Sequence, residues 1–447
     1  MNSTLDIIPF KNGCSGEIII PGSKSISNRA LLLAALSNCR TTLSGVLKSQ
    51  DVELMIKALK TLGIGIIENW VKNEVEIQGC GGTIPQKTEK LYVGNAGTVA
   101  RFLTAWLAIQ KNATYHMDGS LEMRKRPISQ LLNLFQDGGV DVIYAMESGF
   151  FPFTLNTNSF NQDKWMVDAT KSSQILSALM MIAPLCSENQ SIEFQDGTVS
   201  LPFLAITRKM MEDFCGDSDF ECKIHCDHIS IKAKYLRNED FHYEVEPDAT
   251  AASYFITLPQ IVGGSCKVVG IWDEMLQGDS RYSNVLRLQG GLIERGNTGL
   301  VSSFSGQLTG GEFDFNDISD TFLTLAAISP LLTTPLKISG IAHTRLQETD
   351  RVKAMAVELK KLGQKVIEKE DSLEIMPNLN KLKEIAENKI QIETYHDHRV
   401  AMSFGILGSY DLFGNGKSWL TIQNPSCCEK TFPDFFDRIE ALRNNQK

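Results

Sequence analysis

The chain has 447 residues, of which 43% are hydrophobic and 22% charged, and its formal net charge at pH 7 is −9. This length predicts more than one domain, and the composition is that of a soluble globular enzyme rather than a disordered or fibrous chain. The negative charge argues against general nucleic-acid binding, and the longest apolar runs fall well short of the ~20 residues of a membrane span. Any anionic ligand must therefore be held by locally concentrated Lys and Arg.

The N-terminal segment has no basic region followed by an apolar core, so no secretory signal is predicted. Ten cysteines are scattered without the spacing of a disulfide framework, which indicates reduced thiols and a cytoplasmic protein. Cys222, His225, Cys226 and His228 lie close enough in sequence to be considered as metal ligands. However, Cys222, Ile224 and Cys226 alternate with polar residues, as in one half-buried strand, and no second Cys pair lies nearby. We therefore expect no metal site.

The first distinctive stretch is Pro21–Arg29, which follows the strand-like run Glu17–Ile20 and precedes the apolar run Ala30–Leu36. A turn rich in hydroxyls thus opens a buried helix. The first turn of a helix leaves backbone N–H groups unpaired and carries positive potential, so Lys24 and Arg29 there predict a site for phosphate or carboxylate. A capped helix with solvated ends is the alternative interpretation. The Gly-Lys-Ser/Thr order of a Walker A loop is absent.

Helix openings of this kind recur at intervals of roughly 70 to 80 residues along the chain. Each leads into a segment that is apolar all round and rich in small residues, such as Phe102–Ala108, and such helices must be buried. The six openings begin at Lys24, Asn95, Lys171, Asp248, Asp317 and His396.

A second helix type is amphipathic and mostly ends near a glycine that fits a C-cap. Strand-like runs such as Val75–Gln78 and Leu336–Ser339 lie between the helices. The chain is thus predicted to contain six copies of a unit with two helices and several strands, arranged as two lobes of three. The predicted amphipathic helices are Asp51–Leu62, Ile128–Asp137, Pro202–Cys215, Arg281–Gln289, Thr349–Leu362 and Pro433–Leu442.

Unusual polar residues gather at the buried-helix openings, where three converging helix N-termini per lobe predict an anion-binding cleft between facing lobes. Arg124–Pro127 is a basic turn before an amphipathic helix, where a bound anion or solvent would balance the cations. Asp320, Arg345–Arg351 and His396–Arg399 add acid–base groups in the second lobe. Each alone is more often a cap or an ion pair. Together they favour an enzyme that acts on multiply anionic substrates.

Six motifs, in order along almost the whole chain, resemble those of the 5-enolpyruvylshikimate-3-phosphate synthase family. The resemblance implies an α/β fold: a two-lobed inside-out α/β barrel of six βαβαββ repeats, three per lobe, with buried central helices. It implies a C-terminal lobe of residues 1–21 and 244–447, an N-terminal lobe of residues 22–243, and an active site in the cleft between the lobes. The motifs are Ile20–Ser25, Gly94–Thr98, Arg126–Ile128, Glu348–Arg351, Asp397–Arg399 and Lys430–Asp434.

The resemblance implies a transferase of the shikimate pathway, which supplies chorismate and the aromatic amino acids. The enolpyruvyl group of phosphoenolpyruvate is transferred to the 5-hydroxyl of shikimate 3-phosphate through a tetrahedral intermediate, and phosphate is released. Neither a metal nor an organic cofactor is implied, nor is a nucleic-acid or membrane partner, and the family suggests a monomer.

The resemblance also implies roles for individual residues. Asp320 is the expected base for the hydroxyl proton, Glu348 exchanges a proton with the methylene carbon, Lys24 bridges both substrates, and His398 completes the catalytic set. The residues expected to bind shikimate 3-phosphate are Lys24, Ser25, Arg29, Ser172, Ser173, Gln174, Ser200, Asp320, His343 and Gln347. The residues expected to bind phosphoenolpyruvate are Lys24, Asn95, Gly97, Thr98, Arg126, Gln174, Arg351, Arg399 and Lys430.

Several positions depart from the family pattern: Gln347 stands where Lys is usual, His343 for Asn, Phe203 for Tyr and Phe102 for Pro. We hypothesise that Arg345 partly compensates for the missing cation at position 347. One alternative is a catalytically weakened or dead homologue that only binds substrate. Another is a UDP-N-acetylglucosamine enolpyruvyl transferase, although the reactive Cys typical of that family is absent from residues 120–126.

Overall fold

The computed structural model describes residues 3–160, 162, 164–168, 173–194, 201–216 and 218–444. The chain separates into two compact units: unit 1 is Met1–Pro21 with Pro247–Lys447, and unit 2 is Gly22–Glu246. The second boundary between the units follows Glu246, three residues beyond the predicted one between residues 243 and 244, so it leaves strand β14 (Phe241–Glu244) whole. That strand pairs in parallel with β3 (Arg40–Ser44), so all of it belongs to unit 2.

Unit 2 contains three four-stranded sheets, ordered β14-β3-β5-β4, β6-β7-β9-β8 and β10-β11-β13-β12. In the second sheet, β6 and β7 are parallel, whereas β9 is antiparallel to both β7 and β8, which gives a βαβαββ unit. The other elements are α1 (Lys24–Leu36), α2 (Gln50–Thr61), β4 (Gly65–Asn69), β5 (Glu74–Gln78), β6 (Thr88–Tyr92), α3 (Gly97–Ala108), β7 (Ala113–Asp118), η1 (Met123–Lys125), α4 (Ser129–Asp137), β8 (Asp141–Tyr144), β9 (Phe153–Thr157), β10 (Lys164–Val167), α5 (Ser173–Cys186), β11 (Asn189–Phe194), α6 (Leu201–Cys215), β12 (Glu221–Ile224) and β13 (His228–Lys232).

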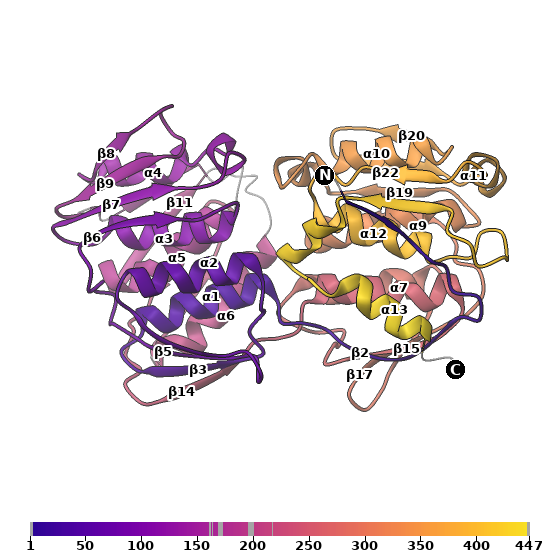
Figure 1. Ribbon diagram of the computed structural model, residues 1–447. Coiled ribbons are helices and arrows are strands. Elements are labelled where there is room, and N and C mark those ends of the chain that lie inside the picture. The colour runs from indigo at the N-terminus through magenta and orange to yellow at the C-terminus, as the bar shows by residue number, and fades with distance from the viewer. Residues whose placement is uncertain are drawn as a thin grey trace. The chain divides into compact units, whose positions relative to one another are not determined.

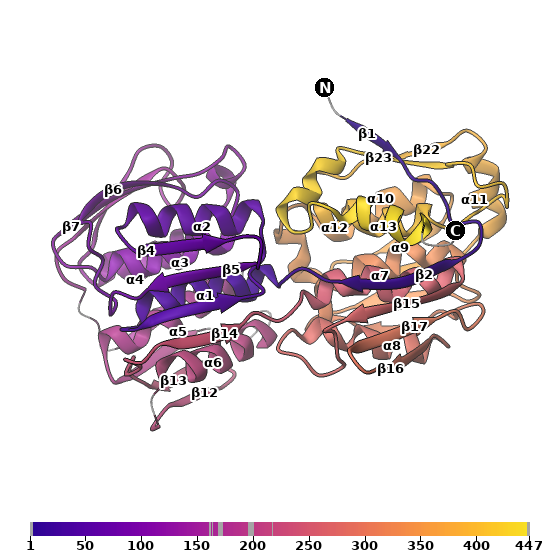
Figure 2. The ribbon, with the colours of Figure 1, turned by 60° about the horizontal axis from the view of Figure 1, so that its bottom comes forward.

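Unit 1 repeats the pattern in sheets β16-β17-β15-β2 and β18-β19-β21-β20, and a three-stranded sheet β1-β23-β22 completes it. Two N-terminal strands join sheets formed by the distant second half of the chain (Figure 2). The elements are β1 (Thr4–Asp6), β2 (Cys14–Ile19), α7 (Ala249–Val262), β15 (Gly264–Val269), η2 (Gly278–Arg281), α8 (Tyr282–Leu288), β16 (Leu292–Arg295), β17 (Gly299–Ser303), β18 (Gly311–Asp314), η3 (Asn316–Thr321), α9 (Phe322–Ile328), η4 (Ser329–Leu331), β19 (Leu336–Ser339), η5 (Ala342–Leu346), α10 (Arg351–Lys361), β20 (Lys365–Glu368), β21 (Ser372–Met376), α11 (Leu379–Ala386), β22 (Ile390–Ile392), α12 (His398–Gly408), β23 (Leu420–Gln423), η6 (Pro425–Lys430) and α13 (Phe435–Asn444).

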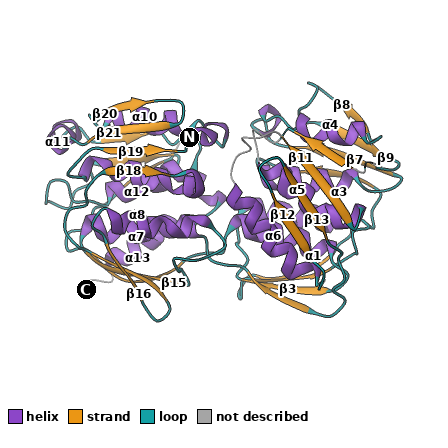
Figure 3. Cartoon of the chain, turned by 180° about the vertical axis from the view of Figure 1, so that it is seen from behind, coloured by secondary structure: helices purple, strands orange, loops and turns teal. Residues whose placement is uncertain are grey.

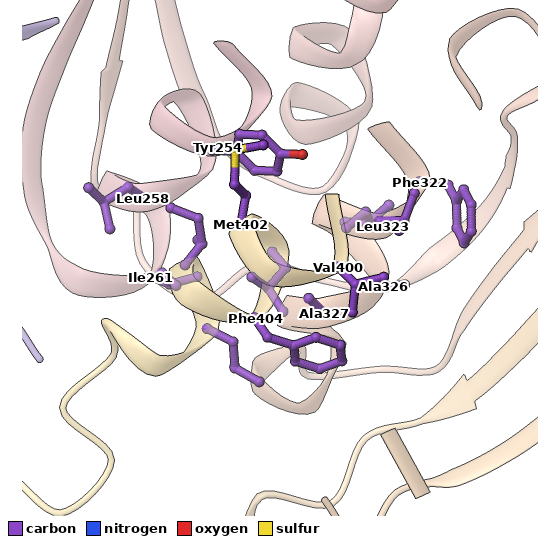
Figure 4. Packing of buried hydrophobic residues seen from close by; sticks show 14 of the residues in the cluster. Tyr254, Leu258, Ile261, Phe322, Leu323, Ala326, Ala327, Val400, Met402 and Phe404 are labelled. Atoms are coloured by element: carbon purple, nitrogen blue, oxygen red, sulfur yellow. The ribbon is translucent and has the colours of Figure 1, made fainter. Parts of the chain in front are cut away.

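Within each unit the helices lie inside and the sheets lie outside (Figures 1 and 3). Every residue of α3 and of α12 is buried, because apolar and small side chains surround most of each helix and their few polar residues lie mainly near the N-terminal end. In unit 1, α12 packs against α9 and α7, and Leu258, Ala327 and Phe404 contribute to the shared core (Figure 4). The predicted six-repeat α/β fold with buried central helices is thus confirmed.

The predicted helix starts are close to the observed ones, with one change of geometry. The opening at Asp317 begins as the 3₁₀ helix η3, and the α-helix itself starts only at Phe322. The predicted strand through Cys226 is wrong, since β12 ends at Ile224 and the chain reverses there, which leaves Cys226 exposed. Among the described residues, we find no group of three His, Cys, Asp or Glu that could hold a metal ion. In the same part of the chain, no helix combines the length and apolarity needed to cross a bilayer.

Candidate active site

The start of α1 places Lys24 beside a carboxylate. Ser23 caps the helix by accepting a hydrogen bond from the Ile26 backbone N–H at 3.4 Å. Lys24 Nζ lies 3.5 Å from Asp51 Oδ2 in the first turn of α2, and both side chains are largely buried. The ammonium group is therefore held at the N-terminus of a buried helix, next to the half-buried Ser25.

Arg29, in the second turn of α1, reaches the second turns of two other buried helices. Its Nη2 donates to Ser177 Oγ of α5 at 2.9 Å, and its guanidinium lies 5.3 Å from the ring centroid of Phe102 in α3. Nε donates to Thr207 Oγ1 of α6 at 2.8 Å. The Arg29 Cζ atom lies 5.7 Å from the ring centroid of Phe203. Two of the departures from the family pattern, Phe102 and Phe203, thus both contact this arginine.

The charge of Arg29 is not balanced by a carboxylate within the part of the chain that the structure describes. All of its hydrogen bonds go to neutral oxygens, the third being from Nη1 to the Ser25 carbonyl at 3.0 Å. Burial lowers the pKa of Arg29 to about 9, so the group is still charged at neutral pH. A buried, unbalanced cation is costly without an anionic partner, which makes this position suited to a ligand carboxylate or phosphate.

The start of α3 brings a glycine against a guanidinium. A Cβ on Gly97 would lie 2.8 Å from Arg126 Nη2, so a larger residue here would displace the end of the Arg126 side chain. Arg101 donates to the carbonyls of Gly97 and Pro127, both at 3.2 Å, and so ties the helix start to the basic turn. Burial and the charge of Arg126 lower the pKa of Arg101 to about 9. The turn therefore presents a second concentration of positive charge.

The remaining predicted residues of unit 2 also lie at helix starts. Thr98 and Ser173 are buried. The side-chain oxygens Oδ1 of Asn95 and Oε1 of Gln174 are buried and accept no hydrogen bond from described residues. Such acceptors are suited to a ligand N–H or O–H group, or to water. Ser172 and Ser200 lie outside the described residues.

In unit 1, Arg351 at the start of α10 is the centre of a buried ion network. Nε donates to Asp397 Oδ2 at 2.7 Å, Nη1 to Asp320 Oδ1 at 2.9 Å and Nη2 to Glu348 Oε2 at 2.9 Å. Nη1 also donates to the amide oxygen of Gln347. One guanidinium thus joins the C-terminal end of η3 to the N-terminal ends of α10 and α12.

Two further cations extend this network. Arg399 Nη2 donates to Asp320 Oδ2 at 2.8 Å, and Lys430 Nζ donates to Glu348 Oε1 at 2.8 Å. Each of the two predicted catalytic carboxylates is therefore held between two cations. The carboxylates outweigh the effect of burial and hold the pKa of Arg351 and of Arg399 above the ordinary value. The cations can exchange these carboxylates for the anionic groups of a ligand.

Two histidines and Asp279 complete the surroundings. Burial lowers the pKa of His343, whose Nε2 lies 2.8 Å from Ser319 Oγ. His398 is buried, and its Nδ1 lies 3.7 Å from Asp397 Oδ1. Burial, followed by the charge of Asp320, raises the pKa of Asp279 to about 8, so this carboxyl is neutral at pH 7.

The structure does not support the hypothesis that Arg345 replaces the missing lysine cation. Its Nη1 donates to Asp350 Oδ1 and to Glu368 Oε1, both at 2.9 Å. Nε and Nη2 donate to the backbone carbonyls of Glu370 and Lys369. Arg345 is therefore committed to Asp350 and to the end of β20 with the turn that follows it, whereas Gln347 contributes an acceptor to Arg351.

Sequence reasoning missed four residues that shape the site. Asp397 belongs to the motif Asp397–Arg399, and its position as the N-cap of α12 is the signal that could have identified it as a site residue. Asp279 carried no signal, because its closeness to Asp320 depends on the packing of η2 against η3. Ser177 and Thr207 are ordinary helix residues in the sequence.

Residues 11–439 match the family model described as EPSP synthase (3-phosphoshikimate 1-carboxyvinyltransferase). Relatives named 3-phosphoshikimate 1-carboxyvinyltransferase include one from Opitutus terrae, 41% identical over 98% of this chain and 97% of its own. Another from Nostoc punctiforme is 38% identical over 98% of each chain. The solved EPSP synthase of Acinetobacter baumannii has a TM-score of 0.78 at 21% identity, covering 99% of this chain and 98% of its own.

Proposed function

The chain belongs to the EPSP synthase family, and we propose that it transfers the enolpyruvyl group of phosphoenolpyruvate to the 5-hydroxyl of shikimate 3-phosphate, releasing phosphate. The observation that carries this proposal is the network around Arg351, in which Asp320 and Glu348 each accept a hydrogen bond from its guanidinium group. The two substrates bring two phosphates and two carboxylates, which need charge-assisted and partly bidentate partners.

Asp320 takes the proton of the 5-hydroxyl while the hydroxyl oxygen forms a bond to the enol carbon of phosphoenolpyruvate. Both of its oxygens accept from arginines, Oδ1 from Arg351 and Oδ2 from Arg399, which orients the carboxylate. The base is therefore positioned by the same cations that attract the anionic substrate.

Glu348 delivers the proton to the methylene carbon. In the absence of ligand its two oxygens accept from Arg351 and Lys430. When the phosphate and carboxylate of phosphoenolpyruvate take over these cations, the Glu348 carboxyl becomes able to hold and donate a proton. The tetrahedral intermediate then returns a proton from its methyl group, the double bond re-forms, and phosphate leaves with the electrons of the carbon–oxygen bond.

The positively charged side chains have the main substrate-binding roles. Arg29 and Lys24 bind shikimate 3-phosphate, supported by the unbalanced buried charge of Arg29. Arg126, beside Gly97 in unit 2, has the role of a phosphoenolpyruvate ligand, and so have Arg351 and Arg399 of unit 1. The smaller polar residues at the helix starts complete these two sets. They are Ser25, Ser173, Gln174, His343 and Gln347 for shikimate 3-phosphate, and Asn95, Thr98 and Gln174 for phosphoenolpyruvate.

The test is phosphate release from phosphoenolpyruvate with shikimate 3-phosphate, against UDP-N-acetylglucosamine as the control acceptor. We expect release with the first acceptor only, and a loss of at least about a thousandfold in kcat for Asp320→Asn. Release with the second acceptor instead would overturn the assignment. Binding of shikimate 3-phosphate without any release would identify a homologue that only binds substrate.

We further propose that the chain acts as a monomer in the cytoplasm. All ten cysteines are free, which fits a reducing compartment. Light scattering coupled to size-exclusion chromatography should give a mass near 49.6 kDa at working concentration. A mass of twice that value would contradict the monomer.

A further inference from the structure

Two consecutive residues in unit 1 hold a backbone conformation that side chains disfavour. Tyr395 and His396 have φ values of 54° and 56°, in the left-handed region where Cβ crowds the carbonyl oxygen. They lie between β22 and α12, directly before Asp397. The chain is therefore held in an unfavourable turn at the point where it enters the ion network.

A buried carboxylate holds this turn. Tyr395 Oη donates to Glu358 Oε1 at 2.7 Å, and the side chain of Glu358 is 0% exposed. The same carboxylate accepts from Lys361 Nζ at 2.8 and 2.9 Å and from the backbone N–H of Glu393 at 3.3 Å. Glu358 is thus fixed from several directions and offers the tyrosine hydroxyl one defined partner.

Helix α10 contacts the turn at two points. Arg351 and Glu358 are seven residues apart, which is about two helical turns and places them on one face of the helix. Arg351 binds Asp397, directly after the disfavoured pair, and Glu358 binds Tyr395, the first residue of the pair. Asp397 in turn accepts from the Arg399 backbone N–H at 2.8 Å and caps α12.

We propose that Glu358 and Tyr395 are positioning residues, whose hydrogen bond keeps the left-handed turn closed so that Asp397 sets Arg351 and Arg399 for phosphoenolpyruvate. The inference rests on the proposed role of these two arginines. Without the hydroxyl, the turn is free to relax toward an extended conformation. Asp397 then moves, so the Arg351 guanidinium loses a carboxylate partner and the Arg399 backbone N–H loses its acceptor at the start of α12. Misplacement by about 1 Å at such a site reduces activity strongly.

Tyr395→Phe tests the proposal, because it removes the hydroxyl and keeps the ring. We expect the KM for phosphoenolpyruvate to rise about tenfold while the KM for shikimate 3-phosphate stays within about twofold. Tyr282→Phe is the control, since it also removes a hydrogen-bonded tyrosine hydroxyl in unit 1, one bonded to Thr257 Oγ1 at 2.9 Å. We expect Tyr282→Phe to leave both KM values unchanged.

A second substitution separates positioning from general damage. Glycine adopts the left-handed region without cost. His396→Gly should therefore let the turn keep its conformation without the hydrogen bond between Tyr395 and Glu358. In the Tyr395→Phe background, His396→Gly should restore the KM for phosphoenolpyruvate to within about threefold of the parent value. Absence of this rescue, or equal changes in both KM values, would overturn the proposal.

Arg351→Met, measured alongside, separates this inference from the assignment on which it rests. If Arg351→Met leaves the KM for phosphoenolpyruvate unchanged, the proposed role of Arg351 fails, and the inference fails with it. If Arg351→Met raises that KM and Tyr395→Phe does not, only the positioning role of Tyr395 and Glu358 is refuted.

Discussion

Replacing Gln347 by Lys, the residue usual in the family, should destabilise the ligand-free protein. The amide oxygen of Gln347 accepts a hydrogen bond from Arg351, and a lysine ammonium group has no acceptor. Gln347→Lys therefore removes one partner from a buried guanidinium and adds a second cation beside it. An anionic ligand that binds between the two cations should reverse the effect.

The size of the effect follows from the surroundings of residue 347. Loss of one hydrogen bond to a charged group costs about 1.5–3 kcal/mol. Two cations 4 Å apart would add about 4 kcal/mol at an effective dielectric constant of 20, but position 347 is half-buried and a lysine there can turn toward solvent. We therefore expect a loss of about 2 kcal/mol, which for a unit of about 220 residues lowers the unfolding midpoint by about 4 °C.

Differential scanning calorimetry with and without saturating phosphoenolpyruvate measures this effect. Gln391→Lys is the control, because Gln391 is an exposed glutamine of the same unit whose amide contacts only Gln423 among the described residues. We expect a lower midpoint for Gln347→Lys alone and a smaller difference in the presence of ligand. An unchanged or higher midpoint without ligand would refute the reasoning.

Three further predictions concern Gly97, Asp279 and Arg29. Gly97→Ala puts a Cβ against Arg126, so the KM for phosphoenolpyruvate should rise about tenfold in steady-state assays; an unchanged KM would contradict this contact. Asp279 holds a proton in the native state up to a pKa of about 8 but ionises near pH 4 when unfolded. Stability should therefore fall between pH 4 and 8, by at most about 1.4 kcal/mol per pH unit, and urea unfolding of Asp279→Asn should lack this slope. Arg29→Met removes an unbalanced buried charge, so it should raise the thermal midpoint while increasing the KM for shikimate 3-phosphate about a hundredfold; a lower midpoint would show that the hydrogen bonds of Arg29 dominate.

Local patterns predicted the helices because burial and capping act over short distances. The all-round apolar run after Asn95 could only be a buried helix, and α3 is buried along its whole length. Asp248 and Asp397 cap their helices as side chains of this type usually do. These elements required no knowledge of distant partners.

Pairing between distant segments could not be predicted in the same way. The exact boundary after Glu246 depends on the pairing of β14 with β3, about 200 residues earlier, and nothing local in the sequence marks that pairing. The partners of Arg345 and Gln347 were also hidden, since both lie in one short loop and differ only in where tertiary contacts direct them. The sequence identified which residues are chemically unusual, but not which of them neutralise one another.

The most direct test of the account is the isotope content of the product formed in D₂O. If Glu348 delivers a deuteron from solvent to the methylene carbon, a transient CH₂D group forms, and loss of one of its two protium atoms leaves deuterium in the product's vinyl group. NMR of the wild-type product should show this deuterium, and Glu348→Gln should form product and incorporate deuterium at least about a hundredfold more slowly. A vinyl group that keeps only protium during normal turnover would contradict the addition–elimination mechanism and the role of Glu348.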